Sequence, residues 1–134
     1  MTSGPKLVSI LRQNEYLIAS IHTALDDTEM DRFREDLVEQ IGRHRSRGVV
    51  IDITGVPDVD EAVANHLVQT VDASRLMGAS VIITGLSPEI AQTLVTIGVD
   101  LSKMDTIGDL QGGLEEAERL LGYTVARPGG AMGP

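Results

Sequence analysis

The chain contains no cysteine and no tryptophan, and it has just one phenylalanine and two tyrosines. Without cysteine, disulfides and thiolate metal sites are excluded. With so few aromatic side chains, the core of this 134-residue chain has to be built from Val, Ile, Leu, Met and Ala. A chain of this length suits one domain with a single core.

Basic residues are also scarce, because 11 Lys and Arg stand against 20 Asp and Glu and give a net charge of −9. This balance argues against a nucleic-acid partner, which would require a basic face, and against binding to anionic membranes. It favours solubility, or a partner with a basic docking surface. No run approaches the roughly 20 apolar residues of a membrane span, and the polar start does not resemble a signal peptide. We therefore expect a cytoplasmic protein.

The sequence divides into three parts. Residues 1–5 are expected to be a flexible start and residues 6–121 a single folded domain. Residues 122–134 are rich in Pro and Gly, and we expect them to form a disordered tail.

The folded part opens with two strand-like runs, residues 6–11 and 15–22, which predict an antiparallel hairpin with its turn at residues 12–14. Asp26 and Glu29 then form an Asp-x-x-Glu pattern, which is typical of a helix start. The predicted helix has an apolar stripe at helical spacing: Met30, Phe33, Leu37 and Ile41. Its basic end either complements the helix dipole or forms a docking patch: Arg43, His44, Arg45 and Arg47.

The rest of the chain is organised around residues 48–77. The apolar, β-branched run at residues 49–53 predicts a strand that is buried on both faces. A Gly and a Pro break it, and Asp58 with Glu61 then predicts a helix start with a capping box. This helix also has an apolar stripe: Val63, Leu67 and Val71.

The second half repeats the alternation of strand and helix. A strand is predicted at residues 80–84, and Ser87, Pro88 and Glu89 begin another helix. A short strand is predicted at residues 103–106, with a final helix from Thr106. The order β-β-α-β-α-β-α-β-α predicts an α/β fold, with a mainly parallel sheet, an antiparallel edge hairpin and about four helices.

The sequence offers little for catalysis. No two of the three histidines, His22, His44 and His66, have metal-ligand spacing, and there is no phosphate-binding glycine loop or nucleophile elbow. We therefore expect no enzyme activity, no cofactor and no metal site. A small enzyme that uses His66 and nearby acids is the weakest alternative. The acids that begin the central helix either complement its dipole or mark a functional site: Asp58, Asp60 and Glu61.

Three segments together resemble the STAS domain, the anti-sigma-factor antagonist family: residues 51–60, 75–79 and 84–94. The resemblance to its stressosome branch is closer still, and it comes from the opening at residues 8–11 and the continuation through residues 25–27. The resemblance covers about residues 6–121. It implies a STAS fold and a non-catalytic scaffold that assembles with an RsbR-type STAS paralogue and sequesters an RsbT-type switch kinase. It also implies an RsbX-type phosphatase that resets the scaffold. Separately, the short apolar hairpin at residues 7–21 leaves a sheet edge to cover, so we expect self-association, at least to a dimer, through the first strands and the neighbouring helices.

The resemblance implies a phosphorylation switch at the start of the central helix, where a Ser or Thr follows Asp60. This chain has Glu61 there, which imitates a phosphate only in part, with one negative charge in place of nearly two. Two interpretations fit Glu61: a natural standing charge, or a phosphomimetic substitution. The resemblance also implies that paralogues can carry a second phosphorylatable residue at the start of the first helix. Here that place holds an acid, Asp27, and Thr28 is adjacent to it. The alternative function is a soluble STAS domain that binds a nucleotide or another small ligand near the same helix start.

Overall fold

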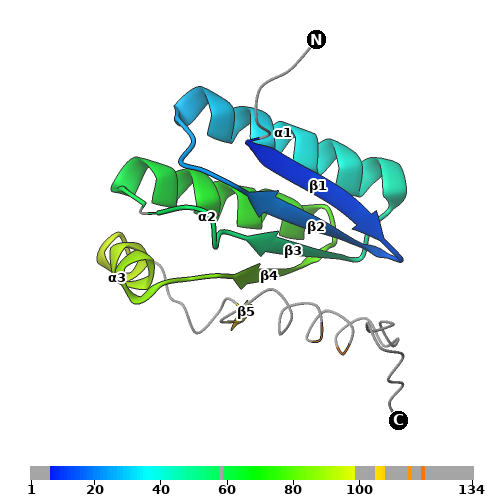
Figure 1. The fold of residues 1–134 in the computed structure, drawn as a ribbon. Coiled ribbons are helices and arrows are strands. Elements are labelled where there is room, and N and C mark those ends of the chain that lie inside the picture. Colours follow the sequence, from blue (N-terminus) through cyan, green and yellow to red (C-terminus); the bar gives the residue numbers. More distant parts are fainter. Residues whose placement is uncertain (1–6, 58, 99–104, 108–114, 116–118, 120–134) are drawn as a thin grey trace.

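A computed structural model describes residues 7–57, 59–98, 105–107, 115 and 119, and Figure 1 shows how its helices and strands are arranged. The elements follow the predicted alternation: β1 (Val8–Gln13), β2 (Tyr16–Ile21), α1 (Asp27–His44), β3 (Gly48–Asp52), α2 (Glu61–Leu76), β4 (Ser80–Thr84), α3 (Pro88–Thr96) and β5 (Asp105–Ile107). The α/β class is confirmed. Most of the predicted fourth helix, the flexible start at residues 1–5 and the tail at residues 122–134 lie outside the described residues.

The described strands form one sheet in the order β1-β2-β3-β4-β5. β1 pairs with β2 antiparallel, and each later pair is parallel. This arrangement confirms the mainly parallel sheet with an antiparallel hairpin at its edge. It also follows from the chain order, because each parallel pair from β2 to β4 is joined through a helix that crosses one face of the sheet.

The predicted hairpin turn is wrong by two residues. Arg12 and Gln13 belong to β1, where they pair with Leu17 and Tyr16. The loop consists of Asn14 and Glu15, and Asn14 has a φ of 56°. Asparagine tolerates this left-handed conformation better than most residues do, so a two-residue loop can form here and the strands continue further than their polarity suggested.

The core lies mainly between the sheet and the two long helices, α1 and α2, which cover the same face of the sheet (Figure 1). The predicted stripe of α1 is fully buried: Met30, Phe33, Leu37 and Ile41. In α2, Leu67 and Val71 are buried and Val63 is half-buried. The alternate strand residues, which point to the opposite face, are also buried: Tyr16, Ile18, Val50 and Ile82. β3 is therefore covered on both faces, as predicted.

We expect Leu67→Ala to lower the free energy of unfolding by about 2–5 kcal/mol, because it opens a cavity beneath α2. Leu67 is 2% exposed, whereas Leu76 in the same helix is 88% exposed. Leu76→Ala is the matched control, and its effect should stay within about 0.5 kcal/mol. Urea unfolding of the two variants measures the difference, and equal losses would show that the core does not lie beneath this face of α2.

Candidate functional site

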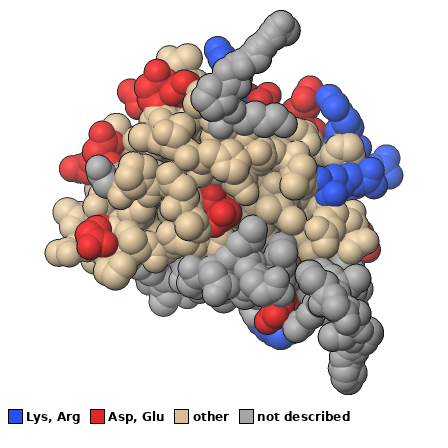
Figure 2. All heavy atoms as spheres, viewed as in Figure 1, with Lys and Arg blue, Asp and Glu red and all other residues tan. Residues whose placement is uncertain are grey.

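The candidate site lies at the end of the sheet that is formed by the C-terminal ends of the parallel strands. α2 follows the loop after β3, and α3 follows the loop after β4. Because β3 and β4 run parallel, both loops leave the sheet at the same edge, and α2 and α3 begin near each other. In Figure 2, which has the view of Figure 1, acidic side chains gather at the end where these helices begin, and Lys and Arg gather at the opposite end.

The helix cap of α2 differs from the prediction. Asp60 is the N-cap residue, and its Oδ1 accepts a hydrogen bond from the Val63 N–H at 2.8 Å. Glu61 is the first helical residue, so the predicted capping box between Asp58 and Glu61 is wrong. Val59, which is 7% exposed, belongs to the core cluster and anchors the chain directly before Asp60. Asp58 lies outside the described residues.

The loop before α2 is held against the loop before α3 by side-chain hydrogen bonds at the end of β3. Asp52 Oδ1 accepts from Thr54 Oγ1 at 2.7 Å and from the buried Thr84 Oγ1 at 2.8 Å. Gly85 has a φ of 80°, and a Cβ at this position would collide with Thr54. Glycine therefore permits both the turn and the close approach of the two loops, which positions the start of α2 relative to α3.

An open groove of about 330 Å³ separates the start of α2 from α3. Its lining comes from both elements: Val59, Asp60, Glu61, Glu89, Gln92, Thr93 and Thr96. The three carboxylates belong to exposed residues, and none of the described residues that line the groove is Lys or Arg. Such a groove suits a cationic side chain of a partner, and like-charge repulsion disfavours the phosphates of a nucleotide.

The start of α1 resembles the start of α2 in one respect. Asp26 is its N-cap residue, and the predicted capping box is confirmed: the Glu29 N–H donates to Asp26 Oδ1 at 2.8 Å, and the Asp26 N–H donates to Glu29 Oε1 at 2.9 Å. Asp27 is the first helical residue, as Glu61 is in α2. Asp27 and Thr28 are both exposed. Each long helix thus begins with an exposed acid next to its cap.

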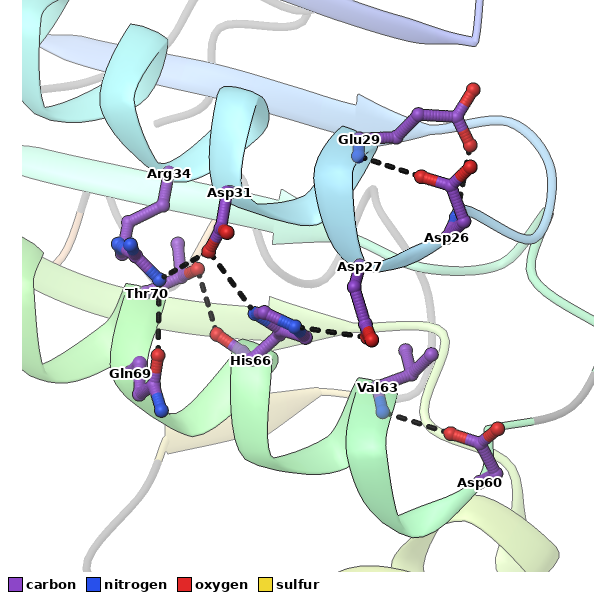
Figure 3. Close-up of polar contacts among 10 residues, drawn as sticks. All are labelled: Asp26, Asp27, Glu29, Asp31, Arg34, Asp60, Val63, His66, Gln69 and Thr70. Atoms are coloured by element: carbon purple, nitrogen blue, oxygen red, sulfur yellow. Dashed lines mark hydrogen bonds and ion pairs between the residues drawn. The ribbon is translucent and has the colours of Figure 1, made fainter.

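The structure brings Asp27 to α2 through His66, as Figure 3 shows. His66 Nε2 lies 3.1 Å from Asp27 Oδ1, and His66 Nδ1 lies 3.5 Å from Asp31 Oδ1. Asp31 also pairs with Arg34 at 3.1 Å, and Arg34 donates to Gln69 Oε1 at 3.0 Å. The sequence had marked Asp27 and His66 separately, and nothing in it marked Asp31, Arg34 or Gln69. The i, i+4 spacing of Asp27 and Asp31 places both on one face of α1. This spacing is the sequence feature that could have indicated that Asp31 lies beside Asp27.

The described residues contain neither a metal-ligand cluster nor a membrane-spanning helix. No group of three or more His, Cys, Asp or Glu among them could hold a metal ion. In the same part of the chain, no helix combines the length and the apolar character that crossing a membrane requires. His22 makes a hydrogen bond to Ser9 Oγ at 2.8 Å in the edge hairpin, and His44 lies in the last turn of α1.

We expect Asp60→Ala to lower the free energy of unfolding by about 1 kcal/mol, because the Val63 N–H loses its acceptor. Asp60→Asn is the matched control: asparagine caps helices about as well as aspartate, so its effect should be a few tenths of a kcal/mol. Chemical unfolding at neutral pH measures both variants. An equal loss in both would mean that the charge at position 60, and not the cap, stabilises α2.

Three comparisons place this geometry among known proteins. The sequence profile of the STAS domain matches residues 8–110. The RsbT co-antagonist protein RsbRA of Bacillus subtilis (strain 168) is 46% identical over 93 residues, which cover 69% of this chain and 34% of RsbRA. The RsbT co-antagonist protein RsbRD of the same organism is 40% identical over 72 residues, 54% of this chain and 26% of RsbRD. The chain thus spans about a third or less of these relatives.

Two solved structures match most of the chain. A serine-to-glutamate variant of RsbS from Moorella thermoacetica has a TM-score of 0.78 and 33% identity, over 88% of this chain and 100% of that one. A structure described as the molecular architecture of the stressosome, a signal integration and transduction hub, has a TM-score of 0.72 and 30% identity. That match covers 84% of this chain and 98% of the other.

Proposed function

The chain belongs to the STAS domain family, and we propose that it is a non-catalytic scaffold of a stressosome, which co-assembles with RsbR-type paralogues and sequesters an RsbT-type switch kinase in the cytoplasm. The observation that carries this proposal is the match to RsbS, which covers the whole of that chain at 33% identity. The relatives named RsbT co-antagonists support the paralogue and kinase partners. The stressosome match supports a large assembly.

Residue 61 is the proposed switch position of this scaffold. Glu61 is exposed, begins α2 and lines the groove against α3, so a partner can reach it. A phosphoryl group here would lie at the positive end of the α2 dipole, which favours negative charge. Glu61 supplies part of that charge permanently. Glu61 carries no phosphate that an RsbX-type phosphatase could remove, so we infer that this position stays in its phosphate-like state.

The other acids named from the sequence are assigned supporting roles in this proposal. Asp60 caps α2 and fixes the orientation of its first turn, and Asp58 precedes the cap. Asp27 supplies a second fixed charge at the start of α1, and Thr28 is the adjacent exposed hydroxyl. The net charge of −9 suits a kinase with a basic docking surface.

We expect Glu61→Ser to create a phosphoacceptor and to tighten binding of an RsbT-type kinase. The reason is that the standing charge of Glu61 imitates the phosphorylated state, in which we propose that the kinase is released. The measurement is a phosphorylation assay together with a binding titration, comparing the chain with its Ser variant. Fold stability should change little, since the Asp60 cap remains in place.

Glu89→Ser is the matched control for this experiment. Glu89 is an exposed acid on the α3 side of the same groove, so its replacement removes an equal charge without creating a phosphoacceptor at residue 61. If the Glu61 chain is phosphorylated as readily as its Ser variant, or if both acid-to-Ser variants bind the kinase equally, residue 61 is not the switch.

We also expect self-association, at least to a dimer, through the edge strand β1 and the neighbouring helix. Among the described strands, β1 has a hydrogen-bonded neighbour on one side only, and Leu7 and Leu11 are 39% and 62% exposed at this edge. Leu11→Lys should shift the solution mass toward the monomer, because burying the added charge in an interface is costly.

Val95→Lys in α3, where Val95 is 57% exposed, is the matched control and should leave the mass unchanged. Light scattering measures the masses, and a concentration-independent monomer for the unaltered chain would contradict the expectation.

A further inference from the structure

The ring of His66 lies between two carboxylates of the neighbouring helix, and this arrangement has a direct chemical consequence. Asp27 and Asp31, both on α1, each place an oxygen near one ring nitrogen, at 3.1 Å and 3.5 Å. The ring is largely enclosed, because the His66 side chain is 16% exposed. His66 Nδ1 is buried and makes no hydrogen bond, since 3.5 Å to Asp31 is too long for one with good geometry.

The two protonation states of imidazole fit this environment unequally. A neutral ring has one N–H donor, so it can donate to Asp27 while its other nitrogen directs a lone pair toward the Asp31 carboxylate. An imidazolium ring carries two donors, one for each carboxylate, and its charge opposes theirs. The geometry therefore suits the doubly protonated ring, and in that state a small movement of Asp31 would complete the second hydrogen bond.

The charges around the ring lead to the same conclusion. Asp31 also pairs with Arg34, which in turn donates to Gln69 on α2. With His66 protonated, the group of Asp27, Asp31, His66 and Arg34 has two negative and two positive charges and is neutral. With His66 neutral, it has a net charge of −1 in a protein that is already strongly acidic. Asp27 and Asp31 are the charged residues of α1 that form an ion pair with the ring, and no other described element places a charged group within an ion pair of it.

We propose that His66 is a pH-sensitive clamp, which in its doubly protonated state holds the first two turns of α1 against α2 and so sets the position of the α2 start that carries Glu61. His66 follows Glu61 by five residues in the same helix, so the clamp acts one turn beyond the exposed acid. Asp27 is the α1 partner of the clamp as well as the first residue of that helix. Only the link to Glu61 rests on the proposed scaffold function, because the clamp itself is a property of this chain alone.

A double-mutant cycle tests the clamp without any partner protein. Asp27→Asn and His66→Gln keep similar shapes and some hydrogen bonding but remove the opposite charges. At about pH 5.5, where carboxylates are ionised and imidazole is largely charged, the effect of the double variant on the unfolding equilibrium constant should differ at least about threefold from the product of the two single effects. At about pH 8, where imidazole is neutral, this coupling should largely disappear.

Asp36→Asn with His44→Gln is the matched control cycle. Asp36 is an exposed acid on the same helix and His44 lies in its last turn, and neither contacts His66. This cycle changes the same charges and should show no coupling at either pH. Coupling of equal size at both pH values in the Asp27–His66 cycle, or none at either, would overturn the clamp.

A second measurement separates a positioning role from simple stabilisation. The Val63 N–H donates to the Asp60 cap, so its NMR chemical shift reports the geometry of the first turn of α2. In the unaltered chain this shift should change between about pH 5.5 and about pH 8, and Asp27→Asn and His66→Gln should each abolish the change. A change that persists in both variants would overturn the link between the clamp and the start of α2. Loss of kinase binding would not bear on this result, so the clamp and the scaffold function can fail independently.

Discussion

The burial of β3 on both faces is the constraint on which the rest of the structure depends. Val49, Val50 and Ile51 are each at most 1% exposed, so this strand has to lie in the interior of the sheet. Parallel neighbours on both sides then require long connections, and the helices α1 and α2 supply them across one face. The loops that leave β3 and β4 consequently meet at one edge, where Asp52 and Gly85 hold them together.

This arrangement explains why the acids collect where they do. Because α1, α2 and α3 all begin at the same edge of the sheet, the residues that complement their dipoles lie at one end of the molecule (Figures 1 and 2). Asp26, Asp60 and Ser87 cap the three helices. Asp27 and Glu61 occupy the next position in two of them and do not cap, so their charges remain available to a neighbouring helix or to a partner.

Several features could be predicted because they depend on local patterns. The period of the apolar residues in α1 places Met30, Phe33, Leu37 and Ile41 on one face whatever packs against them, and these four are buried. The Asp26–Glu29 capping box closes within four residues, so it needs no tertiary contact. The alternation of strands and helices likewise indicated the parallel sheet. The STAS resemblance was already visible in the segments around the central helix, and it led to residue 61.

Other features depend on contacts between segments that are distant in the chain, and no local pattern could supply them. Asp58 and Asp60 are equally good N-cap residues by residue type. Asp60 becomes the N-cap of α2 because the burial of Val59 in the core fixes the chain directly before it. The hairpin turn lies further along the chain than predicted because pairing with β2 extends β1 through two polar residues. Asp27 and His66 are 39 positions apart, and they meet only because α1 and α2 pack side by side on the sheet. Local spacing determines which residues share a face of a helix, whereas the packing of one helix on another determines which side chains meet across it.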